Sequence, residues 1–141
     1  MRILSMDIGD KRIGMAVSDA MGWTAQGILT LERRSMNSDM EQIERIINKY
    51  QVERIVIGLP KNMDGTIGLQ GEKIKVFAES LRKRFSKEIV FWDERLTTVS
   101  AHKVMLEADL SRKKRKERVD QIAAVLILQS YLDYLNYLNG K

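Results

Sequence analysis

The sequence predicts an α/β domain in which helices flank a mixed sheet of five strands. Three short segments near the N-terminus have the composition of strands and are separated by turn residues, as in an antiparallel meander. Two later apolar runs each follow a segment of helical period, which is the pattern of parallel strands joined by crossover helices. Because 141 residues suffice to bury one core, we expect a single domain over residues 1–141.

The antiparallel meander is expected at residues 3–8, 13–18 and 24–31. Glycine and charged residues at 9–12 can turn the chain between the first two strands, which predicts a hairpin. Alternation places the bulky side chains of this hairpin on one face and the small ones on the other. The small face consists of Ser5, Asp7, Gly14, Ala16 and Ser18. Such a face lets a helix or a ligand approach the strands closely.

The first helix is expected to begin at Ser38, with Glu41 three residues later completing a capping box. Its apolar residues recur at helical spacing. They are Met40, Ile43, Ile46, Ile47 and Tyr50. The run at 54–58 is a short buried strand, and it is the first of the two parallel strands.

The second half of the chain continues the alternation of helix and strand. We expect a glycine-rich loop to residue 71, a helix over 72–85, a strand over 89–92, a helix over 98–108 and a last helix over 117–138. The buried side of the last helix is expected to comprise Val119, Ile122, Ala123, Leu126, Ile127, Ser130, Tyr134 and Leu138.

Composition excludes several classes of protein. The chain has no cysteine, so disulfides and thiolate zinc sites are excluded. No apolar run is long enough to cross a bilayer, and the N-terminus lacks the pattern of a signal peptide. We therefore expect a cytoplasmic protein that has no membrane partner.

The net charge of +5 is concentrated in one segment. Residues 111–118 contain six bases and one acid, and the remaining 18 bases and 18 acids cancel. A local positive field of this kind suits a polyanion such as nucleic acid, although charge runs are also found in solvated loops. The candidates for nucleic-acid binding in this basic segment are Arg112, Lys113, Lys114, Arg115 and Lys116.

Three acidic residues are candidates for a metal site. Asp7 lies within a strand, on its small face, and Glu94 directly follows a buried strand, at the edge where α/β sheets collect ligands. Asp120 lies near the start of the last helix, where Ala123 and Ala124 would let that helix pack on the small face of the hairpin. Packing of this kind would point Asp120 toward Asp7.

Three carboxylates that converge can bind hard cations, Mg²⁺ or Mn²⁺. Two such ions together activate a water and stabilise the leaving oxygen in phosphodiester cleavage. The alternative is that each acid forms its own surface salt bridge, since the chain has 19 acids from which three can be chosen.

Four segments resemble the motifs of the YqgF family, also called RuvX-like. They are 7–19 (DIGDKRIGMAVSD), 58–60 (GLP) with Gly65 and Gly68 following, 93–98 (DERLTT) and 119–129 (VDQIAAVLILQ). These segments occur in the order of the family and span nearly the whole chain, so together they are highly specific.

The resemblance implies a ribonuclease H-like fold and metal-dependent cleavage of nucleic acid, with a role in maturing the 5′ end of 16S ribosomal RNA. The acids of the family fall on Asp7, Glu94 and Asp120. Arg12 and Arg95 match its basic positions, and either guanidinium could bind a phosphate through two hydrogen bonds. Lys11, beside Arg12, is a further candidate for nucleic-acid binding.

One departure concerns the wider superfamily. Many of its members carry an acid at the end of the strand that here finishes with Gly58-Leu59-Pro60, and this chain has none there. Glu94, after the next strand, is expected to substitute for it.

Other functions are compatible with parts of the sequence. A Holliday junction resolvase acting on DNA four-way junctions would use the same acids and should be a homodimer that makes paired cuts. A ribosome assembly factor could bind RNA without cutting it, although retention of all three acids argues against this. Sugar and acetate kinases of the actin-like class also open with an Asp-x-Gly hairpin, but they need two such domains.

Replacing the five bases at 112–116 by glutamine is expected to weaken nucleic-acid binding and to flatten its salt dependence. Each lost phosphate contact should reduce the slope of log K against log salt by roughly 0.7–0.9. Titrations of labelled RNA at several salt concentrations measure the slope, and an unchanged slope would remove the basic segment from the interface.

Overall fold

The sheet of this computed structural model has the strand order β3-β2-β1-β4-β5. The structure describes residues 1–97 and 112–140, with side chains at 1–97 and 121–140. β1 pairs antiparallel with β2 and β2 with β3, whereas β1–β4 and β4–β5 are parallel. The predicted mixed sheet, a three-stranded meander continued by two parallel strands, is confirmed.

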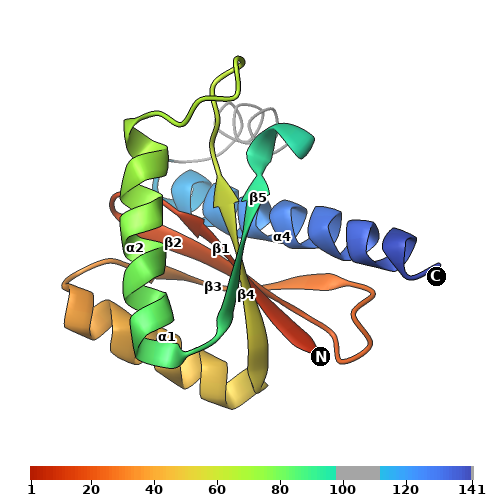
Figure 1. Ribbon diagram of the computed structural model, residues 1–141. Helices are drawn as coiled ribbons and strands as arrows, with labels where there is room; N and C mark the ends of the chain where they lie inside the picture. Colours follow the sequence, from red (N-terminus) through yellow and green to blue (C-terminus); the bar gives the residue numbers. More distant parts are fainter. Residues whose placement is uncertain (98–111, 141) are drawn as a thin grey trace.

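Helices α1 and α2 cover one face of the sheet, and α4 crosses the other (Figure 1). The elements are β1 (Arg2–Ile8), β2 (Arg12–Ser18), β3 (Ala25–Glu32), α1 (Met36–Tyr50), β4 (Val52–Leu59), α2 (Leu69–Phe85), β5 (Glu88–Asp93), the short 3₁₀ helix η1 (Glu94–Leu96) and α4 (Arg112–Leu138). The helix expected over 98–108 lies outside the described residues. None of the helices that the structure describes is long and apolar enough to cross a membrane.

The two faces of the hairpin differ as the alternation predicted. The bulky side chains of β1 and β2 pack with α1 and α2 in the larger core, whose centre includes Leu4, Met6 and Met15. The small side chains face α4. Ser5 Oγ donates a buried hydrogen bond of 2.7 Å to the carbonyl of Ala124, so the backbone of α4 comes close to β1. The expected packing of the last helix on the small face is therefore confirmed.

Helix α1 begins earlier than the sequence predicted. The N-cap is Ser35, whose side chain accepts a hydrogen bond from the backbone N–H of Ser38. The capping box with Ser38 as the cap and Glu41 at its third position is therefore wrong, because Ser38 already lies in the first turn. The predicted apolar face of this helix is confirmed. Of its five apolar residues, all except Tyr50 are buried, and Tyr50 packs against the core.

Two other helices also begin earlier. Helix α2 begins at Leu69 and not at Glu72, and it includes Gly71, which the sequence assigned to the loop. A side chain at Gly71 would collide with Ile67, so this glycine lets Ile67, which precedes the helix, lie against its first turn. Helix α4 begins at Arg112 and not at Glu117, and the basic run 112–116 is therefore part of the helix.

The buried side of α4 is also rotated from the predicted one. Ala123 and Ile127 are buried as expected, but Tyr134 and Leu138 are exposed, and Tyr131 and Leu132 are buried in their place. The sequence favoured Tyr134 and Leu138 because they are apolar at helical spacing. The structure instead buries the pairs 123–124, 127–128 and 131–132, and the half-exposed ring of Tyr134 packs on Trp92 at the edge of this face. Leu138 lies where α4 extends past the sheet at its C-terminal end (Figure 1).

Candidate active site

Asp7 lies at the carboxyl end of β1, on the face covered by α4. Its exposed fraction is 6%, and its partner on β2 is Gly14, which has no side chain. The next parallel strand, β4, has Ile57 opposite Met6, so Asp7 and Gly58 are the following residues on adjacent strands. A carboxylate in this position is poorly hydrated, and its attraction for a cation is screened less than it would be in bulk water.

Glu94, which follows β5, lies at the same edge and on the same face of the sheet as Asp7. It is the first residue of η1, directly after the strand, and its carboxylate folds back over Gly58. A Cβ atom added to Gly58 would lie 2.9 Å from Glu94 Oε1 and would collide with Ile127 of α4. The Glu94 carboxylate is therefore on the α4 face of β4, above the strand beside the one that carries Asp7.

Gly58 is the residue that makes this arrangement possible. The sequence showed it as part of the motif at 58–60 and did not indicate its role. Comparison with the wider superfamily predicted that Glu94 substitutes for the acid that is absent at the end of β4. The structure puts a Glu94 carboxylate oxygen against the space that a side chain at Gly58 would fill.

Asp120, the third acid, belongs to α4 by its backbone position, four residues before Ala124. Its side chain lies outside the described ones, and so do those of the basic run 112–116. Among the side chains that are described, no group of three acids, histidines or cysteines could hold a metal. The structure thus brings Asp7 and Glu94 to one face and edge of the sheet, and the convergence of all three acids stays a prediction.

Lys11 and Arg12 lie at the same end of the hairpin as Asp7. The turn is closed by the Gly9 N–H, which donates to the carbonyl of Arg12 at 2.8 Å. Arg12 Nε is buried and has no hydrogen-bond partner among the described residues. The two bases line a hollow of about 290 Å³ together with Arg33 and two acids, Asp10 and Glu32. Their position suits contacts to a phosphate chain that passes Asp7.

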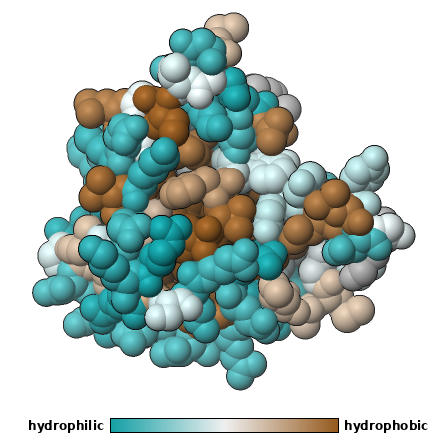
Figure 2. Space-filling view, viewed as in Figure 1, coloured by the Kyte–Doolittle hydropathy of each residue, from teal (hydrophilic) through white to brown (hydrophobic). Residues whose placement is uncertain are grey.

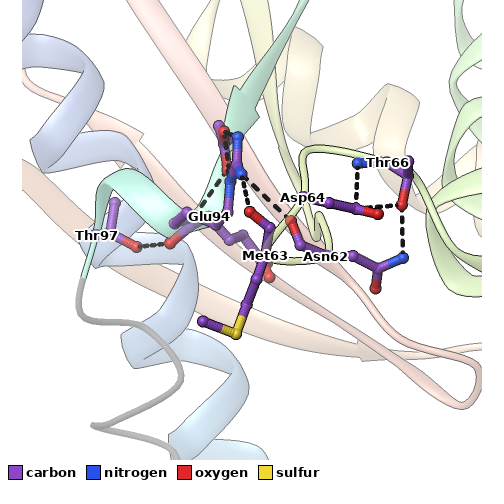
Figure 3. Close-up of polar contacts among 8 residues, drawn as sticks. Asn62, Met63, Asp64, Thr66, Glu94 and Thr97 are labelled. Atoms are coloured by element: carbon purple, nitrogen blue, oxygen red, sulfur yellow. Dashed lines mark hydrogen bonds and ion pairs between the residues drawn. The ribbon is translucent and has the colours of Figure 1, made fainter.

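Arg95 binds within the protein in this structure, and two of its partners are Asn62 and Met63, which Figure 3 labels. Its Nε and Nη2 donate to the Asp93 carboxylate, and its Nη1 donates to the carbonyls of Asn62 and Met63 at 3.2 and 3.4 Å. The hydrogen bond from Arg95 also lowers the pKa of Asp93 below its ordinary value. The predicted phosphate contact of Arg95 thus stays a prediction, and the structure adds a link to the loop after β4 that the sequence did not indicate.

Comparison with sequence relatives gives one family. The model of the RuvX family, described as Holliday junction resolvase, matches residues 1–134. A protein of Clostridium tetani named "Putative pre-16S rRNA nuclease" is 59% identical over 117 residues, which are 83% of this chain and 85% of that protein. A Clostridium perfringens protein of the same name is 58% identical with the same coverage.

Solved structures agree on the fold. The chain is similar to RuvC of T. thermophilus in complex with a Holliday junction substrate, with a TM-score of 0.66 at 9% identity over 97% of this chain and 96% of that one. The Fowlpox virus resolvase in complex with Holliday junction DNA gives a TM-score of 0.54 at 15% identity over 96% and 99% of the two chains. The ribonuclease H-like fold that the resemblance implied is confirmed.

Replacing Gly58 by alanine is expected to destabilise the protein and to displace Glu94. The new methyl group would overlap Ile127 and the Glu94 carboxylate, and overpacking of this kind costs about 1–3 kcal/mol. Denaturant unfolding measures the loss of stability.

Gly27→Ala is the matched control, because Gly27 lies in β3 under the same helix and its added Cβ would stay 3.4 Å or more from its neighbours. Equal stability of the two variants would contradict the close approach at Gly58.

Proposed function

Because this chain belongs to the RuvX family of nucleases, we propose that it is a metal-dependent nuclease that processes the 5′ end of pre-16S ribosomal RNA. The RNA substrate is supported by the names of the two Clostridium relatives, whose identity to this chain approaches 60% over most of both sequences. The observation that carries the mechanism is the Glu94 carboxylate lying over Gly58, beside the strand that carries Asp7.

The donor set at this edge fits a hard cation. Asp7 and Glu94 offer carboxylate oxygens, and Asp120 would add a third carboxylate from α4. Mg²⁺ and Mn²⁺ prefer such oxygen ligands and keep open positions for water and phosphate oxygens. The absence of cysteine in the chain leaves no thiolate to favour a softer metal.

When two ions are bound, they supply a water activated for attack and neutralise the charge that develops on the leaving oxygen. The protein residues fix the geometry. Asp7 is held by the β1–β2 pairing, and the Glu94 carboxylate lies over Gly58 of β4. Lys11 and Arg12 bind phosphate oxygens at the hairpin end, which aligns the scissile phosphodiester with the two carboxylates. Water adds to phosphorus, the bond to the leaving oxygen breaks, and that oxygen takes up a proton.

Cleavage of DNA four-way junctions is the second candidate. It is supported by the description of the family model and by the fold shared with two resolvases. This function requires a homodimer with two active sites, because paired cuts are needed to resolve a junction. The mass of the protein in solution, alone and with a junction, tests this requirement.

The decisive experiment compares two substrates with and without Mg²⁺ or Mn²⁺: an RNA containing the precursor 5′ end of 16S RNA, and a synthetic four-way DNA junction. We expect metal-dependent cleavage of the RNA. Asp7→Asn and Glu94→Gln should each lower the rate by about a hundredfold or more, because each removes a charged ligand.

Glu53→Gln is the control for these substitutions, since Glu53 is an exposed acid at the opposite end of β4. Cleavage of the junction alone would favour the resolvase. Binding of RNA with no cleavage by the wild-type protein would identify an assembly factor and overturn the nuclease proposal.

A further inference from the structure

Three large apolar side chains project into solvent around the candidate active site. The exposed fractions of Met63, Leu69 and Leu96 are 100%, 77% and 63%. Met63 lies in the loop after β4, Leu69 begins α2, and Leu96 ends η1, so all three lie at the carboxyl end of β4 and β5. Apolar residues appear in Figure 2 at the end of the molecule where this loop and η1 lie. We call these three residues the apolar rim.

The loop that carries Met63 is held in one shape by its own hydrogen bonds. The Asn62 backbone N–H donates to the carbonyl of Thr66, and the Asn62 side chain donates to Thr66 Oγ1, both at 2.9 Å. The Asp64 carboxylate accepts from the Thr66 hydroxyl and N–H, which lowers the pKa of Asp64. Gly65 closes the turn onto Asn62 with a φ of +87°, a value that favours glycine.

Arg95 connects this loop to the active site. It directly follows Glu94 in the chain, and its guanidinium bridges Asp93 and the carbonyls of Asn62 and Met63. The backbone of Met63 is thereby fixed relative to Glu94, the candidate metal ligand. In Figure 3 the Met63 side chain extends away from the contacts of Asp64 and Thr66.

The Met63 side chain gains no burial in the free protein, because it is fully exposed. The loop is ordered by hydrogen bonds and by Ile67, which packs against the core, and the Met63 side chain adds to neither. An apolar side chain beside a site for a polyanion cannot bind phosphate, which requires charge or hydrogen-bond donors. It can pack on the faces of bases, because the thioether is flexible, polarisable and favourable next to aromatic rings.

We propose that Met63 packs between bases next to the cleaved phosphodiester and unstacks them, as a wedge that positions paired substrate for cleavage. This inference rests on the nuclease function proposed above. Apolar wedges, methionine among them, open base steps in other proteins that deform nucleic acid. Arg95 and Asp93 are positioning residues in this scheme, because they act on substrate through the loop. Leu69 and Leu96 would flank the opened step.

The test uses Asp7→Asn protein, which should bind without cutting, and an RNA stem with 2-aminopurine beside the expected cleavage site. Unstacking of this base raises its fluorescence. We expect the rise on binding to be lost when Met63→Ala is added and retained when Met63→Leu is added.

Met21→Ala is the matched control, because Met21 is 70% exposed and lies in the turn between β2 and β3, at the opposite end of the sheet. This control should keep the full fluorescence change.

Cleavage provides the second measurement. In protein with Asp7 intact, Met63→Ala should lower kcat/KM on the paired stem about tenfold and leave an unpaired strand nearly unchanged, because only the paired substrate must be unstacked. Arg95→Gln should reproduce this selective loss, since it removes the hydrogen bonds to the Asn62 and Met63 carbonyls and leaves the Met63 side chain in place.

The outcomes separate the two proposals. If the wild-type protein cleaves and Met63→Ala matches Met21→Ala in both measurements, the wedge is wrong and the nuclease stands. If the wild-type protein binds and unstacks the stem but never cleaves it, the nuclease proposal fails, and only the insertion of Met63 between bases is supported, without its role in cleavage. Absence of any binding to the stem would overturn both.

Discussion

The close contact of α4 with the small face of the sheet is the constraint on which the rest of the structure depends. Ser5 donates to the carbonyl of Ala124, and Ile127 fills the space over Gly58. Larger residues in place of Ser5 and Gly58 would push α4 away from the sheet, because overpacked contacts are relieved by movement of the backbone. Gly14 and Gly58, which have no side chains, leave room at the carboxyl edge of the sheet for Asp7 and Glu94.

The two faces of the sheet therefore have different tasks. The face under α1 and α2 buries most of the large aliphatic side chains and supplies the main hydrophobic stabilisation. The α4 face buries smaller groups and tolerates polar ones, among them Ser5, Asp7 and Ser18. Burying an acid costs free energy, and a strong core on the opposite face allows the fold to carry that cost at a functional site.

The features that the sequence predicted correctly depend on the local spacing of apolar residues. The sequence did not predict features that depend on contacts between residues far apart in the chain. Two-residue alternation assigned the hairpin faces correctly, including the position of Asp7. The sequence placed the cap at Ser38 because Glu41 follows at capping-box spacing, whereas the structure uses Ser35. It assigned Gly71 to the loop because glycine disfavours helices, whereas the helix includes Gly71, where a side chain would collide with Ile67. The fold of Glu94 over Gly58 and the link from Arg95 to the loop join separate strands, so no spacing in the sequence encodes them.

The most direct test of the account is anomalous diffraction from crystals of the protein soaked in Mn²⁺. The account predicts a manganese peak that has carboxylate oxygens of both Asp7 and Glu94 within about 2.5 Å. Peaks bound only by other acids, such as Asp64 in the loop, or a peak on one of the two carboxylates with the other turned away, would contradict the claim that the small face brings them to a common cation.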